Sequence, residues 1–421
     1  MARIVLTTWG SLGDLHPFLA LAIELQRRGH TATVATLGTW RENVERAGVG
    51  FLPIRPDVDP DDPSARDVVR RILDARGGPE YLFNELFAPV IDEVYEDTLA
   101  AVVGADLLVS HQLPQTAPIV AERTGIKWVS AVVAPFGFLS AYDPSTPPQA
   151  PSLRRLLAVH PAAGRAFNRL VRLVTDRWMA PLYGLRARLG LPRGGHPLFE
   201  GQHSPARVLA LFSGVFADRQ PDYPPQTVLT GFPFYDAAPT RAVDPGLLEF
   251  LDSGEPPVVF TLGSSAVWIA DDFYPVSIAA VRALGRRALL LTGENASAIR
   301  AQVPDTIGVF DYAPHSLVMP RASIVVHQGG IGTTAQALRA GRPTLVVPFG
   351  QDQPDNARRV VTLGVGRTIS RGGYGVERLV RELTRLGDSR YAARAQAVGA
   401  RISAEDGAGT ACDAIEAELE A

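Results

Sequence analysis

A repeated order of short strand, loop and helix constrains the fold of this chain more than any other feature. Residues 3–8 have the apolar, β-branched character of a buried strand, and residues 9–15 form a loop with two glycines. Residues 17–25 then have helical spacing, and another strand pattern follows at 31–36. The same order returns over residues 105–134. Strands joined in this way lie parallel with helices on both faces of the sheet, which predicts a doubly wound α/β domain.

A second series of strands begins after a proline-rich interval. Six prolines lie between Gln220 and Pro245, a density that central strands and helix interiors do not tolerate. We therefore predict two doubly wound parallel-sheet domains joined by a linker, with a ligand cleft between them. The later strand patterns lie at 258–262, 288–291, 324–326 and 344–347. The predicted boundaries are 1–219 for the first domain, 220–245 for the linker, 246–405 for the second domain and 406–421 for a C-terminal helix that can pack back on the first domain.

The composition excludes several other classes of protein. The 421 residues include 41 basic and 44 acidic side chains, a formal net charge of -3, so nucleic acid is not an expected partner. Cys412 is the only cysteine and cannot form an intramolecular disulfide, which predicts a cytoplasmic protein. Lys127, the only lysine, does not follow a glycine-rich stretch, which excludes a Walker A loop. No apolar run reaches the ~20 residues of a spanning helix, so integral membrane association is not expected.

Residues 153–193 differ from the rest of the chain in charge. They contain nine arginines and one acidic residue, Asp176, with apolar residues at helical spacing. A basic amphipathic helix of this kind can make peripheral contact with an anionic membrane or cover an apolar acceptor. An ordinary helix with a solvated basic face is the more common interpretation, and we favour it here.

The stretch from Ile324 to Leu338 has the pattern of an anion-binding loop. A strand ends at Val326, glycines follow that let the backbone approach a ligand closely, and a helix is expected to start near Thr333. The free N–H groups of that helix start, together with side-chain donors, suit a diphosphate. The side-chain donors are His327, Thr333 and Thr334. The alternative is a glycine-rich turn that only permits close packing of strand and helix.

Asp352 and Gln353 follow the next strand and are therefore expected at the same carboxyl edge of the sheet. A carboxylate beside an amide suits vicinal sugar hydroxyls, because one side chain accepts and the other both donates and accepts. In isolation Asp352 would rather be a helix cap. Residues 330–335 also satisfy the G-x-G-x-x-A pattern, so an NAD(P)-dependent oxidoreductase is an alternative, although dehydrogenases usually carry it at the first strand of the nucleotide domain.

The run His327–Asn356 and the opening Gly10–Pro17, with its sequence GSLGDLHP, resemble two signatures of one family. They are similar to the donor-binding motif and the N-terminal loop of GT-B nucleotide-sugar glycosyltransferases of the bacterial family 1 type, related to macrolide, glycopeptide and sterol glycosyltransferases and to rhamnosyltransferases. The resemblance implies two Rossmann-like domains that face a central cleft and an inverting mechanism without metal or cofactor. It also implies a UDP- or dTDP-sugar donor, a hydrophobic small-molecule acceptor such as a natural product, polyketide, flavonoid or lipid, and a monomer or homodimer.

The resemblance assigns donor contacts by position. Tyr312 would stack on the nucleobase and the Ala313 backbone would bond its edge, because Tyr312–His315 stands where relatives have Trp-x-Pro-Gln. Gln328 stands where relatives carry a phosphate-binding histidine, with His327 one place earlier, and Gln336 stands where many have a ribose-binding glutamate. The implied donor set is Gly13, Gly263, Ser264, Ser265, Tyr312, Ala313, His315, His327, Gln328, Gly330, Gly332, Thr333, Thr334, Gln336, Asp352, Gln353 and Asn356. A protein that binds a nucleotide sugar without turnover is a further alternative.

Three residues are candidates for the base that inverting transfer requires. Asp14 occupies the family's base position, His111 follows a strand that ends at the same sheet edge, and His16 lies in the same loop as Asp14. Each has a structural alternative: Asp14 as the cap of a helix that starts near Pro17, and the two histidines as packed side chains. The triplet at residues 57–59 matches a metal-binding DxD pattern, but the prolines around it predict a solvated acidic turn, and no metal is expected.

Overall fold

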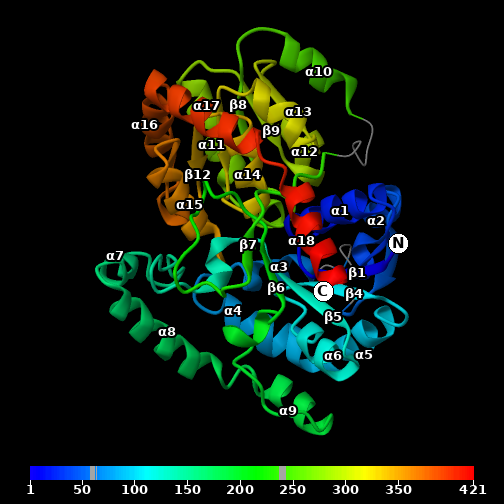
Figure 1. The fold of residues 1–421 in the computed structure, drawn as a ribbon. Helices are drawn as coiled ribbons and strands as arrows, with labels where there is room; N and C mark the ends of the chain where they lie inside the picture. The colour runs from blue at the N-terminus through cyan, green and yellow to red at the C-terminus, as the bar shows by residue number, and fades with distance from the viewer. Residues whose placement is uncertain (57–61, 63, 237–242) are drawn as a thin grey trace. The chain divides into compact units, whose positions relative to one another are not determined.

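The computed structural model describes residues 1–56, 62, 64–236 and 243–421, and the acidic triplet at 57–59 lies outside these ranges. The chain divides into two compact units (Figure 1). The first contains residues 1–65, 76–235 and 406–421, and the second contains residues 66–75 and 236–405. The division at residue 235 falls inside the proline-rich interval.

The first unit contains a seven-stranded sheet, and every pair of neighbouring strands in it is parallel. The strand order is β3-β2-β1-β4-β5-β6-β7, so β2 and β3 extend the sheet to one side of β1 and the later strands extend it to the other. Ile4 pairs with Ala32 on one side and with Leu107 on the other. The strands are β1 (Arg3–Thr7), β2 (Thr31–Thr36), β3 (Gly50–Pro53), β4 (Leu107–His111), β5 (Lys127–Val132), β6 (Arg207–Ala210) and β7 (Thr227–Leu229).

The second unit contains a six-stranded parallel sheet with the order β10-β9-β8-β11-β12-β13. Its central strands are continuous apolar runs, because helices cover both faces of a parallel sheet. Val258 and Phe260 belong to the core cluster on one face, and Val259 belongs to the cluster on the other. The strands are β8 (Val258–Thr261), β9 (Ala288–Leu291), β10 (Ile307–Phe310), β11 (Ile324–His327), β12 (Thr344–Val346) and β13 (Gly366–Thr368).

The helices connect successive strands across the faces of the two sheets (Figure 1). In the first unit they are α1 (Leu12–Arg27), α2 (Arg41–Arg46), α4 (Gly78–Tyr81), α5 (Ile91–Ala101), α6 (Ala117–Thr124), α7 (Leu153–Leu157), α8 (Pro161–Thr175), α9 (Ala180–Arg188) and α18 (Gly407–Glu420). In the second unit they are α10 (Pro245–Asp252), α11 (Phe273–Ala283), α12 (Ala296–Arg300), α13 (His315–Val318), α14 (Ile331–Arg339), α15 (Gln353–Thr362), α16 (Val376–Leu386) and α17 (Ser389–Ser403), together with nearly all of α3 (Ala65–Ile72). None of the helices in the described ranges is long and apolar enough to cross a membrane.

Two local outcomes differ from the sequence patterns. The arginine-rich stretch 153–193 forms three helices, α7, α8 and α9, rather than one. The proline-rich interval is not free of regular structure, because β7 lies within it. β7 is the edge strand of its sheet, and an edge is where a strand flanked by prolines is tolerated.

The last helix, α18, packs on α1 through a charged cluster centred on Arg28. The Arg28 guanidinium donates to Glu24 at 2.8 Å, to Asp413 at 2.6 Å and to Glu416 at 2.5 Å. Cys412 is buried beside it, and burial raises the pKa of its thiol to about 12. Hydrogen bonds from Arg27 and then Arg28 hold the pKa of the Glu24 carboxyl at about 2.

We expect this cluster to make stability dependent on acidity. Glu24 stays charged in the folded protein down to a pH of about 2, whereas its ordinary pKa is 4.5. The stabilisation from its arginine partners is therefore complete above pH 4.5 and is lost as the pH falls toward 2. The Arg28→Gln variant should melt below the wild type at neutral pH, and thermal unfolding should show the Tm gap narrowing across this window. Arg41→Gln, which removes an exposed ion pair with Glu45, serves as a control with little effect at any pH; a gap for Arg28→Gln that stays constant with pH would contradict the expectation.

Candidate functional site

Asp14 lies in the first turn of α1, where a capping box with Ser11 fixes its side chain. The Ser11 side chain accepts a hydrogen bond from the Gly13 N–H, and the Asp14 Oδ2 accepts from the Ser11 N–H at 2.8 Å and from its hydroxyl at 3.0 Å. The helix therefore starts at Leu12 instead of near Pro17, and Ser11, not Asp14, is its N-cap. Gly10 has φ +131°, and a Cβ there would lie 2.5 Å from the Asp14 Oδ2. Only glycine lets this carboxylate fold back on the loop.

The second carboxylate oxygen of Asp14 faces His111 at the end of β4. The distance from Asp14 Oδ1 to His111 Nε2 is 4.0 Å, and the His111 Nδ1 lies 3.5 Å from the Thr8 hydroxyl. The His111 ring is buried against Phe18. Burial lowers the pKa of His111, although the Asp14 charge acts in the opposite direction. The pair therefore consists of a neutral imidazole behind a more accessible carboxylate, whose side chain is 23% exposed.

His16 lies apart from this pair. It is two residues after Asp14 on the same helix, and side chains at that spacing do not face each other. Its ring packs on Tyr235 with centroids 5.2 Å apart, and burial lowers its pKa to about 4. Of the three candidates, the structure brings Asp14 and His111 together.

In the second unit, the glycine loop after β11 leads into α14, whose N-cap is Gly330. The helix starts at Ile331, two residues earlier than expected. The buried His327 accepts a hydrogen bond at its Nδ1 from the Gly329 N–H, and burial lowers its pKa to about 3. Gln328 instead reaches the loop after β8: a Cβ on Gly263 would lie 2.5 Å from the Gln328 Nε2 and 3.4 Å from the Thr333 hydroxyl.

Unpaired polar atoms gather in this loop. Among the described residues, His327 Nε2, Gln328 Oε1 and Asn356 Oδ1 are buried without a hydrogen-bond partner. Buried polar groups are normally paired, so such a cluster marks a place where a ligand or water completes the bonding. Ser264 and Ser265 are partly exposed beside Gly263, and Gly332 is partly exposed in the first turn of α14.

Two polar residues of α14, Thr334 and Gln336, form hydrogen bonds within their own helix. The Thr334 hydroxyl donates back to the Gly330 carbonyl at 2.9 Å, a bond within the helix. Gln336 accepts from Arg339 at 2.8 Å, and Arg339 in turn forms a two-pronged ion pair with Asp236. These contacts restrain the Gln336 side chain.

Asn356 joins the glycine loop to the loop after β12. Its Nδ2 donates to the Gly329 carbonyl at 2.9 Å and to the Asp352 Oδ2 at 2.7 Å. Asp352 occupies the N-cap position of α15, yet its side chain makes no capping bond to the helix backbone. The Gln353 Oε1 accepts from the N–H groups of Phe349 and Gly350 and so shapes the loop.

A segment from the first half of the chain braces this loop, and the sequence pattern did not indicate it. Residues 66–75 pack in the second unit, with Leu73 in its core. Gln351 has φ +55°, and its Nε2 donates to the Ile72 carbonyl at 2.5 Å. A Cβ on Gly350 would lie 2.2 Å from the Leu73 carbonyl oxygen. The backbone of residues 72–73 therefore holds the loop that carries Asp352.

Tyr312, Ala313 and His315 follow β10 at the same carboxyl edge as the loops after β8, β11 and β12. The Tyr312 side chain is exposed, whereas Ala313 is buried and contributes only backbone to any contact. In the described ranges no group of three His, Cys, Asp or Glu residues is arranged to hold a metal ion.

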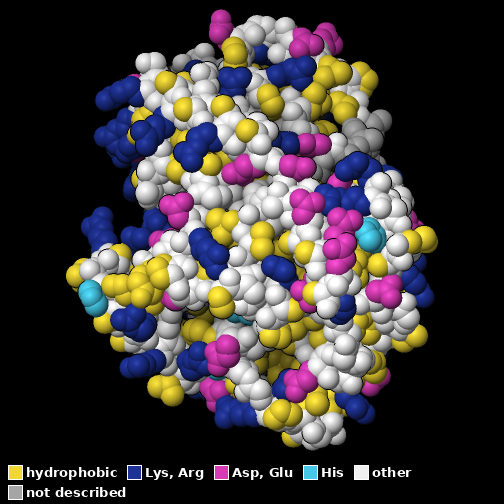
Figure 2. All heavy atoms as spheres, in the orientation of Figure 1, with side chains coloured by type: hydrophobic (Ala, Val, Ile, Leu, Met, Phe, Trp, Pro, Cys, Tyr) yellow, Lys and Arg dark blue, Asp and Glu magenta, His cyan; other side chains and the backbone are white. Residues whose placement is uncertain are grey.

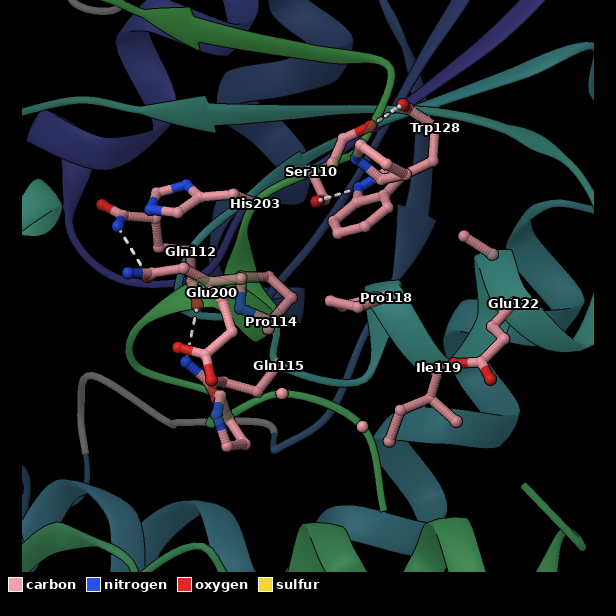
Figure 3. Close-up of a pocket in the computed structure, with 18 of the residues that line it drawn as sticks. Ser110, Gln112, Pro114, Gln115, Pro118, Ile119, Glu122, Trp128, Glu200 and His203 are labelled. Carbon is pink, nitrogen blue, oxygen red and sulfur yellow. Dashed lines mark hydrogen bonds between the residues drawn. The ribbon is translucent and has the colours of Figure 1, made fainter. Parts of the chain in front are cut away.

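The first unit also contains a cavity of about 540 Å³, drawn in Figure 3. Its lining includes Ser110, Trp128 and Ile119, and the Trp128 Nε1 donates to the Ser110 hydroxyl at 2.8 Å. Successive strand residues point to opposite faces, so the Ser110 side chain lies on the face opposite to that of His111. His111 is nevertheless among the residues that line the cavity, whereas Asp14 is not.

Comparison with known proteins agrees with this architecture. The N-terminal domain of glycosyltransferase family 28 matches residues 4–135, and the erythromycin biosynthesis protein CIII-like C-terminal domain matches residues 278–415. The chain is 32% identical over 430 residues to the O-mycaminosyltylonolide 6-deoxyallosyltransferase of Streptomyces fradiae, covering 98% of this chain and 97% of that protein. It is 28% identical over 446 residues to a sterol 3-beta-glucosyltransferase of Neosartorya fischeri, covering 99% of this chain and only 30% of that longer protein.

A solved structure shows the same fold. The spinosyn rhamnosyltransferase SpnG complexed with thymidine diphosphate superposes with a TM-score of 0.69 at 17% identity, covering 99% of this chain and all of that one. Two Rossmann-like units of parallel strands define a GT-B fold. The protein belongs to the family 1-type GT-B glycosyltransferases.

A substitution at Gly350 tests whether the backbone of residues 72–73 supports the loop that carries Asp352. The Gly350→Ala substitution places a methyl group against the Leu73 carbonyl, and we expect it to lower the free energy of unfolding by about 1–3 kcal/mol. Gly372→Ala is the matched control, because nothing lies within 4 Å of a Cβ at that exposed position. Urea unfolding of both variants measures the difference. Equal stability of the two variants would show that the segment 66–75 does not press on the loop.

Proposed function

We propose that the chain transfers a sugar from a UDP- or dTDP-sugar to a hydroxyl of a hydrophobic small molecule and inverts the anomeric centre. The observation that carries the proposal is the cradle in the second unit, where Gly263, Gln328 and Thr333 meet at the start of α14 beside Asp352 and its partner Asn356. The relatives named above are glycosyltransferases for a macrolide and for sterols, which supports a hydrophobic acceptor. They also leave the NAD(P)-dependent alternative without support.

The start of α14 would hold the donor diphosphate. Its free N–H groups and the positive end of its dipole favour an anion at this point. Gln328 is the better phosphate ligand of the two neighbours, because its amide already reaches the Gly263 loop. His327 is fully buried and holds the Gly329 N–H, so its role is to shape the loop.

Asp352 would hold the sugar. A carboxylate has about four acceptor positions, so Asp352 can keep its bond from Asn356 and still accept from sugar hydroxyls. The Gln353 Oε1 already accepts a hydrogen bond from the Phe349 N–H, which leaves the N–H groups of the Gln353 side-chain amide as donors to the sugar. Tyr312 would stack on the base from the end of β10. SpnG was solved in complex with thymidine diphosphate, which supports dTDP as one donor class to test.

Asp14 would act as the base. In the step we propose, the acceptor oxygen attacks the anomeric carbon while its proton passes to the Asp14 carboxylate. The bond from the anomeric carbon to the phosphate oxygen breaks, and the nucleoside diphosphate leaves with the electron pair. His111, 4.0 Å behind Asp14, would stabilise and orient the carboxylate. The acceptor proton would thus pass to Asp14, which is more exposed than His111.

The first test of function is thermal stabilisation by UDP, dTDP, GDP, NAD and NADP. A nucleotide that binds only the folded protein raises the Tm, by the equivalent of about 2.7 kcal/mol at a hundredfold excess over its Kd. We expect a shift with dTDP or UDP, and we expect the Gln328→Ala variant to reduce it. Gln302→Ala, in the turn after α12, is the control for a surface amide. A shift with NAD or NADP alone would overturn the proposal.

The second test concerns the base. Asp14→Asn keeps a capping oxygen but cannot take a proton, and we expect kcat to fall by about 10²–10⁴-fold with little change in the Tm. Ser11→Ala is the control for capping, expected to cost about 1 kcal/mol of stability with a far smaller loss of kcat. Turnover is measured with the donor that the first test identifies. An Asp14→Asn enzyme with wild-type kcat would remove Asp14 from the mechanism.

A further inference from the structure

The helices α7 and α8 expose an unusual amount of apolar surface. Eleven large hydrophobic side chains are exposed in the described part of the chain, and six of them lie between residues 142 and 174. Leu173 is 77% exposed and Val159 is 78% exposed. The six residues are Tyr142, Leu156, Val159, Leu170, Leu173 and Val174. Figure 1 shows α8 running between α7 and α9 along the outside of the first unit.

The spacing along α8 places these residues on one face of the helix. Leu173 and Val174 lie three and four residues after Leu170, so the three side chains project from the same side of the helix. The opposite face packs inward at Gly164, where a Cβ would lie 2.5 Å from the Ala141 carbonyl oxygen. Helices of water-soluble domains turn their apolar stripe toward the core, whereas α8 also presents leucines to the outside.

Arginines border the exposed leucines. Arg155, Arg165 and Arg169 are exposed, and none of them forms an ion pair with a described residue. Asp176, the one acidic residue between 153 and 193, is already engaged by Arg193 at 2.7 Å. The surface therefore combines apolar side chains with uncompensated positive charge, and Figure 2 shows yellow and dark blue side chains together over α7 and α8.

We propose that this α7–α8 surface docks on an anionic lipid bilayer. The leucines would enter the boundary between headgroups and acyl chains, while the arginines would extend to the lipid phosphates. A second copy of the chain fits less well, because facing two such surfaces would bring like charges together. The inference does not rest on the proposed function, since lipid binding requires neither nucleotide nor acceptor.

Vesicle sedimentation of the full chain tests the proposal. We expect binding to vesicles of phosphatidylglycerol and phosphatidylcholine that weakens with salt, and much weaker binding to phosphatidylcholine alone. Leu170→Glu with Leu173→Glu should lower the partition coefficient at least about tenfold. Leu248→Glu, at an exposed leucine of α10, is the matched control and should bind as the wild type does. Arg165→Gln with Arg169→Gln should weaken binding and flatten its salt dependence.

Three results would overturn the proposal. The first is a wild-type chain that does not prefer anionic vesicles, and the second is an equal partition coefficient for the leucine variant and the Leu248→Glu control. The third is a wild-type dimer in size-exclusion chromatography that the leucine variant dissociates, without any vesicle binding. Because the substituted side chains are exposed, the Tm of each variant should stay near the wild-type value, which separates loss of docking from loss of folding.

Discussion

The candidate donor site depends on the two hydrogen bonds that the side-chain amide of Asn356 donates. The amide bonds the Gly329 carbonyl in the glycine loop and the Asp352 carboxylate in the next loop, and so fixes the two relative to each other. These loops follow β11 and β12, which pair in parallel and therefore end at one edge of the sheet. Parallel pairing brings the loops near, and one buried amide then sets their spacing. The site is accordingly a property of two connections rather than of one motif.

Asp14 shows how one carboxylate can cap a helix and still present an oxygen for the chemistry proposed for it. Its Oδ2 completes the capping box of α1, whereas its Oδ1 faces the buried His111. Capping and catalysis were competing interpretations of the sequence, yet the two oxygens of a carboxylate make them compatible. The helix cap fixes the orientation of the side chain, and a fixed orientation is what proton transfer to a defined position needs.

The loop that carries Asp352 is held by backbone contacts as well as by side chains. Gln351 has a left-handed backbone conformation, which costs free energy in residues other than glycine. The hydrogen bond from its side chain to the Ile72 carbonyl offsets this cost. The bracing segment precedes the loop by more than 270 positions in the sequence. A segment from the first half of the sequence thus belongs to the second unit, which a division of the sequence at its prolines does not anticipate.

The sequence by itself determined the parallel α/β class and the glycine loop at the start of α14. Both follow from local patterns: continuous apolar runs mark buried parallel strands, and glycines mark close approach of the backbone. The sequence patterns did not indicate β3, β6, β7, β10 and β13, and all of these except β6 are edge strands of the two sheets. Only the tertiary structure decided where neighbouring side chains lie. It buries His327, places Gln328 beside Gly263, brings Asp14 close to His111 and exposes the leucines of α8. Those outcomes depend on contacts between residues far apart in the sequence, which no local pattern encodes.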